Sequence, residues 1–150
     1  MASNLTDWLF LLIFAAWVAG ATTYNYLRPY IPNWYMGIGL LFAISNTYFS
    51  HVAGQGNYSI WVVTAALALL SLVFFYKNVW GGGDTKFMLI ALIAVPDVLA
   101  YCSMLLMLAL KIFYDLVRGR AENTPPIRAV VYLGGGWLLW FLTQLFIFPR

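Results

Sequence analysis

Long uninterrupted apolar runs constrain this chain more than any other feature of its sequence. They do not alternate with polar residues, as the strands of a membrane barrel do, so each run predicts a helix. A helix needs about 20 residues to cross a bilayer. Only 9% of the residues are charged, against about 25% in a soluble domain, so lipid is the expected solvent. The runs that approach the crossing length are Trp8–Tyr24, Trp34–Val52, Ile60–Tyr76, Val98–Val117 and Ala129–Phe148.

One further apolar run, Thr85–Val95, is too short to cross a bilayer alone. It can cross only if the segment before it, Gly81–Asp84, is itself partly embedded as non-helical backbone, which protein or a watery cavity must then cover. Pro96 separates this short span from the next one. We therefore predict an all-α integral membrane protein with six transmembrane helices, the fourth of them short and preceded by a partly embedded glycine-rich loop. These helices form a single membrane-embedded domain over residues 1–150.

The basic residues predict the orientation of the helices. In a six-span arrangement seven of the eight fall at one end, and only Arg150 at the other. By the positive-inside rule that end faces the cytoplasm, and both termini lie outside. These residues are spread over three loops rather than along one stripe, so they do not indicate a nucleic-acid partner. The seven are Arg28, Lys77, Lys86, Lys111, Arg118, Arg120 and Arg128.

Asp84 stands apart from the other acidic residues because it follows three glycines and opens a short apolar helix. Asp115, by contrast, lies one helical turn after Lys111, where a local ion pair is expected. A structural role for Asp84 is an N-cap, because aspartate is among the commonest residues at helix starts. A functional role is also open, since ionisable groups at membrane depth are costly and often mark a site. Glycines without side chains would let a peptide come close to it.

The stretch Gly81-Gly82-Gly83-Asp84-Thr85-Lys86 resembles the GxGDxK motif of the GxGD-type membrane aspartic peptidases, which process type IV prepilins and archaeal preflagellins. A second segment, Asn25 to Asn33, resembles the other motif of that family. There, an aspartate ending the first span is followed six residues later by Ile-Pro-Asn, and the same spacing separates Asn25 from Ile31-Pro32-Asn33.

A third and weaker match is Val130-Val131-Tyr132 with Gly134, which is similar to the Pro-Tyr-Gly stretch that opens the last span in this family. This chain has Val131 where proline is usual. The resemblance covers nearly the whole chain. Its short length and six predicted spans look like the small peptidases of Tad-type pilus systems.

The resemblance implies an aspartic endopeptidase of the prokaryotic inner membrane, with its site at the cytoplasmic face. Two aspartates would face each other across a small polar cavity, one ionised and one protonated, and would activate a water. The substrate would be a prepilin, cut between its short basic leader and its hydrophobic N-terminal helix. Gly81, Gly83, Ile31, Pro32 and Asn33 would shape the site. Lys86 would either bind and orient the substrate or anchor the helix at the membrane surface.

This chain departs from the family at the first catalytic position, which is Asn25 here. An amide can form hydrogen bonds but cannot act as a general base, so the chain as written is expected to be catalytically silent. Three explanations stay open. The aspartate was replaced deliberately to keep a substrate uncut, the protein is a natural pseudopeptidase or prepilin-binding scaffold, or the resemblance misleads and Asn25 is simply a polar helix end.

A second departure concerns cofactors. Larger relatives carry a cytoplasmic insert with paired cysteines after the first span and also methylate the new N-terminus. Here Asn33 runs directly into the second span and Cys102 is the only cysteine, so we expect no metal, no methyl donor and no other cofactor. A transporter is disfavoured, because the charges lie at span ends and the two halves of the chain do not match.

Overall fold

The computed structural model describes residues 5–28, 30–52, 58–77, 81–118 and 128–146. In these ranges the chain is all-α, as predicted. Three stretches are long and apolar enough to cross a membrane, namely Trp8–Leu27, Val98–Val117 and Ala129–Phe146. Six membrane crossings stay a prediction. The helices of the described residues are α1 (Leu5–Leu27), α2 (Asn33–Val52), α3 (Tyr58–Tyr76), α4 (Gly82–Ala94), α5 (Val98–Val117) and α6 (Ala129–Phe146).

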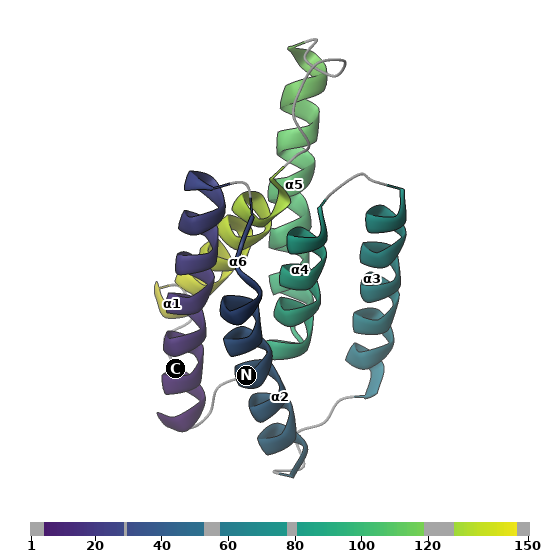
Figure 1. Ribbon diagram of the computed structural model, residues 1–150. Helices are drawn as coiled ribbons and strands as arrows, with labels where there is room; N and C mark the ends of the chain where they lie inside the picture. Colours follow the sequence, from purple (N-terminus) through teal and green to yellow (C-terminus); the bar gives the residue numbers. More distant parts are fainter. Residues whose placement is uncertain (1–4, 29, 53–57, 78–80, 119–127, 147–150) are drawn as a thin grey trace.

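Successive helices run in opposite directions (Figure 1), so the end of α1 and the starts of α2, α4 and α6 lie at the same end of the bundle. We call this the upper end, as it is drawn. The helix α6 packs against α1 and α5, and α4 packs against α2, α3 and α6. The last turns of α5 extend beyond the other helices at the upper end (Figure 1).

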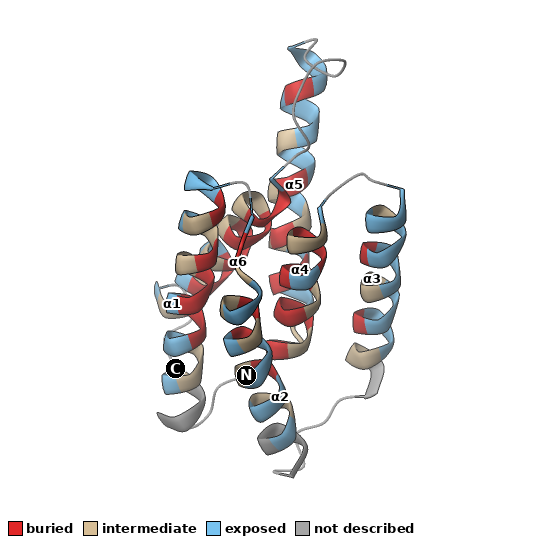
Figure 2. Ribbon diagram, viewed as in Figure 1, coloured by how far each residue is buried: buried red, intermediate tan, exposed pale blue. Residues whose placement is uncertain are grey.

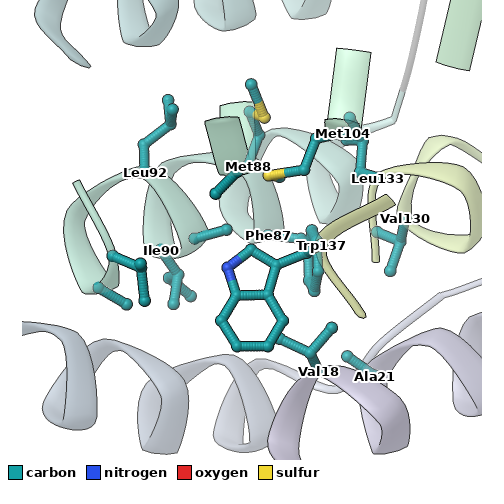
Figure 3. Close-up of a cluster of buried hydrophobic side chains, with 14 of the residues drawn as sticks. Val18, Ala21, Phe87, Met88, Ile90, Leu92, Met104, Val130, Leu133 and Trp137 are labelled. Atoms are coloured by element: carbon teal, nitrogen blue, oxygen red, sulfur yellow. The ribbon is translucent and has the colours of Figure 1, made fainter. Parts of the chain in front are cut away.

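Burial is concentrated on α4 and α6, whereas α3 and much of α5 are exposed (Figure 2). The largest fully buried side chains include Phe87 and Met88 on α4 and Leu133 and Trp137 on α6, and Figure 3 shows them gathered in one cluster. The outward side chains of α3 are mostly apolar, among them Val62, Leu69 and Phe75. Apolar residues on an outer face fit a lipid solvent better than water.

A reciprocal clamp joins α1 to α2 and fixes the turn between them. The indole Nε1 of Trp17 donates to the carbonyl of Tyr35 at 3.0 Å, and the hydroxyl of Tyr35 donates to the carbonyl of Trp17 at 2.8 Å. Each ring lies against a glycine of the other helix, Trp17 on Gly39 and Tyr35 on Gly20, where a side chain would clash. The clamp therefore needs both glycines.

The lower end of α4 is closed by side chains from two neighbouring helices. Pro96 has no N–H, so the carbonyl of Leu92, four residues earlier, needs another donor. The hydroxyl of Tyr101 supplies it at 2.8 Å and also contacts the hydroxyl of Thr64 at 2.8 Å. The next two carbonyls accept from α2: Ile93 from the hydroxyl of Thr47 at 3.1 Å, and Ala94 from the side-chain amide of Asn46 at 2.8 Å.

The prediction of a non-helical segment over Gly81–Asp84 is wrong for most of its length. Gly81 is the N-cap, and α4 already begins at Gly82, so Gly83 and Asp84 lie in its first turn. The first N–H groups of a helix have no acceptor within the helix and must find one elsewhere. The Asp84 carboxylate also accepts the N–H of Gly81 at 3.0 Å, which stabilises this turn. Residues 78–80 and 147–148 lie outside the described residues.

Candidate active site

Asp84 is buried at the start of α4, with 7% of its surface exposed. Its Oδ2 accepts the N–H of Gly81, and its Oδ1 accepts the N–H of Val130 at 2.9 Å. The N-cap position itself is Gly81 and not Asp84, which is the third residue of α4, but the Asp84 carboxylate accepts N–H groups at the starts of both α4 and α6. Burial disfavours the charged carboxylate, while N–H donors on both oxygens favour it.

Asn25 lies in the last turn of α1 and is 4% exposed. Its side-chain Oδ1 has no hydrogen-bond partner among the described residues, and the same holds for Oγ1 of Thr22, one turn earlier on the same helix. A buried acceptor without a donor costs about 1–3 kcal/mol. Position 25 therefore carries hydrogen-bonding capacity that the fold itself does not use.

The start of α6 connects these two residues. The guanidinium Nη1 of Arg128 donates to the backbone carbonyl of Asn25 at 3.2 Å, and the N–H of Val130 donates to Asp84. Arg128 and Val130 are two residues apart in the chain, so the start of α6 contacts both the end of α1 and the start of α4. Of the two predicted catalytic positions, Asn25 makes this contact through its backbone carbonyl and Asp84 through its carboxylate.

Lys86 and Asn33 form a second link between distant segments. The ammonium of Lys86 donates to the side-chain oxygen of Asn33 at 2.8 Å, and both side chains are exposed. Next to Asn33, Ile31 is buried, and the carbonyl of Pro32 accepts the N–H groups of Tyr35 and Met36 as α2 begins. Lys86 therefore contacts the turn that begins α2, a role that neither of its two predicted functions included.

The glycines differ in what surrounds them. A side chain on Gly83 would meet nothing within 4 Å, so the side of α4 next to Asp84 is sterically open there. Gly81 is exposed and contributes its N–H to Asp84. On α6, a side chain on Gly134 would clash with the hydroxyl of Thr22. Gly134 thus lets α6 approach α1 closely, one turn below Asn25.

Arg128 was predicted only as one of the basic residues of the cytoplasmic end, and its contact with α1 was missed. The available signal was Pro29, which has no N–H to offer to the carbonyl of Asn25. The Lys111–Asp115 ion pair is confirmed. Among the described residues no group of three or more His, Cys, Asp and Glu side chains could hold a metal ion.

Comparisons of the chain with protein-family models, with curated proteins and with solved structures found no match. Function therefore has to be inferred from the site. That site consists of two buried polar residues, Asn25 and Asp84, which both contact the start of α6, with an exposed Lys86–Asn33 link at the same end of the bundle.

Proposed function

We propose that this protein has the architecture of a prepilin leader peptidase, an aspartic endopeptidase of the prokaryotic inner membrane, in a form silenced by Asn25. The substrate class is a prepilin whose basic leader lies at the cytoplasmic face and whose hydrophobic helix lies in the lipid. Asp84 is the retained catalytic carboxylate. Asn25 occupies the position of the other one.

One observation carries this proposal: the three segments that resemble the motifs of that family are bonded to one another. Asp84 accepts the N–H of Val130, 46 residues away, and Lys86 donates to Asn33, 53 residues away. The carbonyl of Asn25 accepts from Arg128, two residues before Val130. These bonds join the three motif-like segments at one end of the bundle, which supports a shared site.

The chemistry follows from pairing a carboxylate at position 25 with Asp84. Two close carboxyl groups share one proton, because they cannot easily both ionise. The ionised member takes a proton from a water, whose oxygen attacks the scissile carbonyl, while the protonated member donates to the developing oxyanion. The C–N bond then breaks, and the leaving amine takes up a proton. An amide at position 25 can neither accept nor supply that proton, and loss of one member of a catalytic unit costs about 10⁴- to 10⁶-fold in rate.

The surroundings of Asp84 suit a peptide substrate. The open side next to Gly83 lets a peptide backbone come within hydrogen-bonding distance of the first turn of α4. The start of α4 lies at the same end of the bundle as the end of α1 and the starts of α2 and α6 (Figure 1), where the leader would lie. The apolar outer faces of the helices provide a lipid-facing surface along which a hydrophobic segment can approach.

The test is cleavage of a matching Tad-type prepilin by the Asn25→Asp variant, followed on a gel beside the unchanged chain in the same membranes. We expect a shortened product with the variant and none with the unchanged chain. Absence of product from the variant, with substrate and enzyme both folded in the membrane, would reject a peptidase site.

Asn25 itself favours a second candidate function, a natural pseudopeptidase or scaffold that binds prepilins without cutting them. Its unpaired Oδ1 can accept a hydrogen bond from a bound peptide without any proton transfer. Co-purification of intact prepilin with the unchanged chain fits this function and a silenced enzyme equally. The scaffold predicts that the Asn25→Asp variant binds prepilin as well as the unchanged chain does but does not cut it.

A further inference from the structure

Arg128 does more than add positive charge to one end of the bundle. Its guanidinium donates to two backbone carbonyls of α1, that of Asn25 at 3.2 Å and that of Tyr26 at 2.7 Å. Both carbonyls belong to the last turn of a helix that ends at Leu27, where carbonyls lack partners within the helix. For Asn25 the lack is built into the sequence, because the residue four positions on is Pro29. Arg128 thus supplies the donors that the end of α1 needs.

The guanidinium of Arg128 bonds to carbonyls of α1 and not to an acidic residue of the described part of the chain. The one salt bridge among the described residues joins Lys111 to Asp115, so no carboxylate there is paired with Arg128. A cation at the C-terminal end of a helix is favourable, because the helix dipole places partial negative charge there.

The same short segment also holds the other half of the site. Val130 donates its N–H to Asp84, and the N–H of Val131 donates to the carbonyl of Arg128 at 3.1 Å, so residues 128–131 form one tight turn. This turn therefore links the end of α1 to the start of α4, in addition to the packing of α2 against both helices. Moving Arg128 off the carbonyls would release residue 25 while leaving Asp84 bonded.

We propose that Arg128 is a positioning residue, which holds position 25 at working distance from Asp84 by bonding the last carbonyls of α1. This inference rests on the proposed function and deepens it. Arg128 itself need not touch the substrate. Misplacement of a reacting group by about 1 Å can cost about 100-fold in rate, so loss of Arg128 is expected to lower kcat far more than it raises KM.

The test uses the full-length Asn25→Asp variant in membranes, with Arg128→Ala, Arg128→Lys and Arg28→Ala added one at a time. Arg28 is the matched control, because it is an exposed arginine at the same end whose guanidinium lies over the ring of Tyr24. We expect Arg128→Ala to lower kcat about 10- to 100-fold with KM changed less than about threefold. Arg128→Lys should recover part of the rate, added guanidinium chloride should partly restore Arg128→Ala, and Arg28→Ala should change little.

Hydrogen–deuterium exchange on the same variants reports on position without activity. Arg128→Ala should speed exchange in the last turn of α1, where the N–H of Arg28 donates to the carbonyl of Tyr24, and Arg28→Ala should speed it less. An active Asn25→Asp variant whose kcat survives Arg128→Ala, or unchanged exchange at the end of α1, would overturn the positioning role while leaving the peptidase intact. An inactive Asn25→Asp variant would instead reject the proposed function, and the positioning role with it.

Discussion

The two ends of α4 are built in opposite ways. At the lower end, the three carbonyls near Pro96 that side chains must pair each accept a hydrogen bond, from Tyr101, Thr47 or Asn46. At the upper end Asp84 is bonded and the space beside Gly83 is open, and at the same end of the bundle the buried Oδ1 of Asn25, on α1, has no partner among the described residues. A short helix that ends inside apolar surroundings needs complete pairing for stability. The unpaired acceptor and the open space at the other end fit the proposed site.

Mutations at the lower end of α4 should therefore change the stability of the protein but not its cleavage activity. Tyr101→Phe removes the donor to Leu92 and leaves that buried carbonyl unpaired, while Thr64 keeps its bond to the carbonyl of Ile60. We expect a loss of about 1–3 kcal/mol in the free energy of unfolding, measured by denaturation in mixed detergent micelles. Cleavage by a folded Asn25→Asp, Tyr101→Phe protein should match that of Asn25→Asp alone.

Tyr114→Phe is the control for this change, because Tyr114 is exposed and uses its ring, not its hydroxyl, to contact Arg118. It should leave stability unchanged within about 0.5 kcal/mol. Equal stability of the two variants would show that the lower end of α4 is not held by the hydroxyl of Tyr101.

Mutations at the upper end of α4 should change the cleavage rate more than they change stability. Gly83→Ala places a methyl group in open space within a helix, so stability should stay the same or rise by up to about 1 kcal/mol. In the Asn25→Asp background the same methyl group should impede the substrate and lower the cleavage rate by about tenfold, or about 1.4 kcal/mol in barrier.

Gly135→Ala on α6 is the matched change, because a side chain there also meets nothing within 4 Å. It should stabilise similarly and leave cleavage unchanged. If Gly83→Ala and Gly135→Ala have the same effect on cleavage, the open side of α4 is not where the substrate binds.

The smallest effect is expected for the exposed Lys86–Asn33 link. A double-mutant cycle of Lys86→Ala and Asn33→Ala should give a coupling of about 0.5 kcal/mol in the free energy of unfolding. Lys77→Ala, at an exposed lysine of the same end, should show no coupling to Asn33→Ala. A coupling of zero for Lys86 would leave the link without a role in joining α2 to α4.

The sequence predicted the helices well because apolar runs and helix breakers act locally. The runs ending at Val52, Tyr76 and Val117 became helices with those same ends, and Pro96 separates α4 from α5 as expected. The start of α4 was predicted three residues too late, since α4 begins at Gly82 rather than at Thr85. Three successive glycines indicate a loop, yet a carboxylate that bonds back to Gly81 makes them a helical turn.

The contacts of the site were harder to predict, because they depend on which helices become neighbours. Nothing local to Asp84 indicates that its carboxylate caps α6, or that Lys86 bonds to Asn33. The prolines did carry a usable signal. Pro29 and Pro96 each lack the N–H that would pair the carbonyl four residues earlier. In both cases a side chain from another helix or turn, Arg128 or Tyr101, supplies the donor.

The central claim is that Asp84 and position 25 form one catalytic unit at the upper end of α4. The most direct measurement compares initial prepilin cleavage rates of the unchanged chain, the Asn25→Asp variant and the Asn25→Asp, Asp84→Asn double variant. Asp84→Asn keeps an acceptor for the buried N–H of Val130 and loses only the one for the exposed Gly81, so the fold should persist while the proton chemistry is lost. We predict cleavage by the Asn25→Asp variant that exceeds both other proteins by at least about 10⁴-fold. Equal rates for all three proteins, or cleavage that survives Asp84→Asn, would contradict this claim.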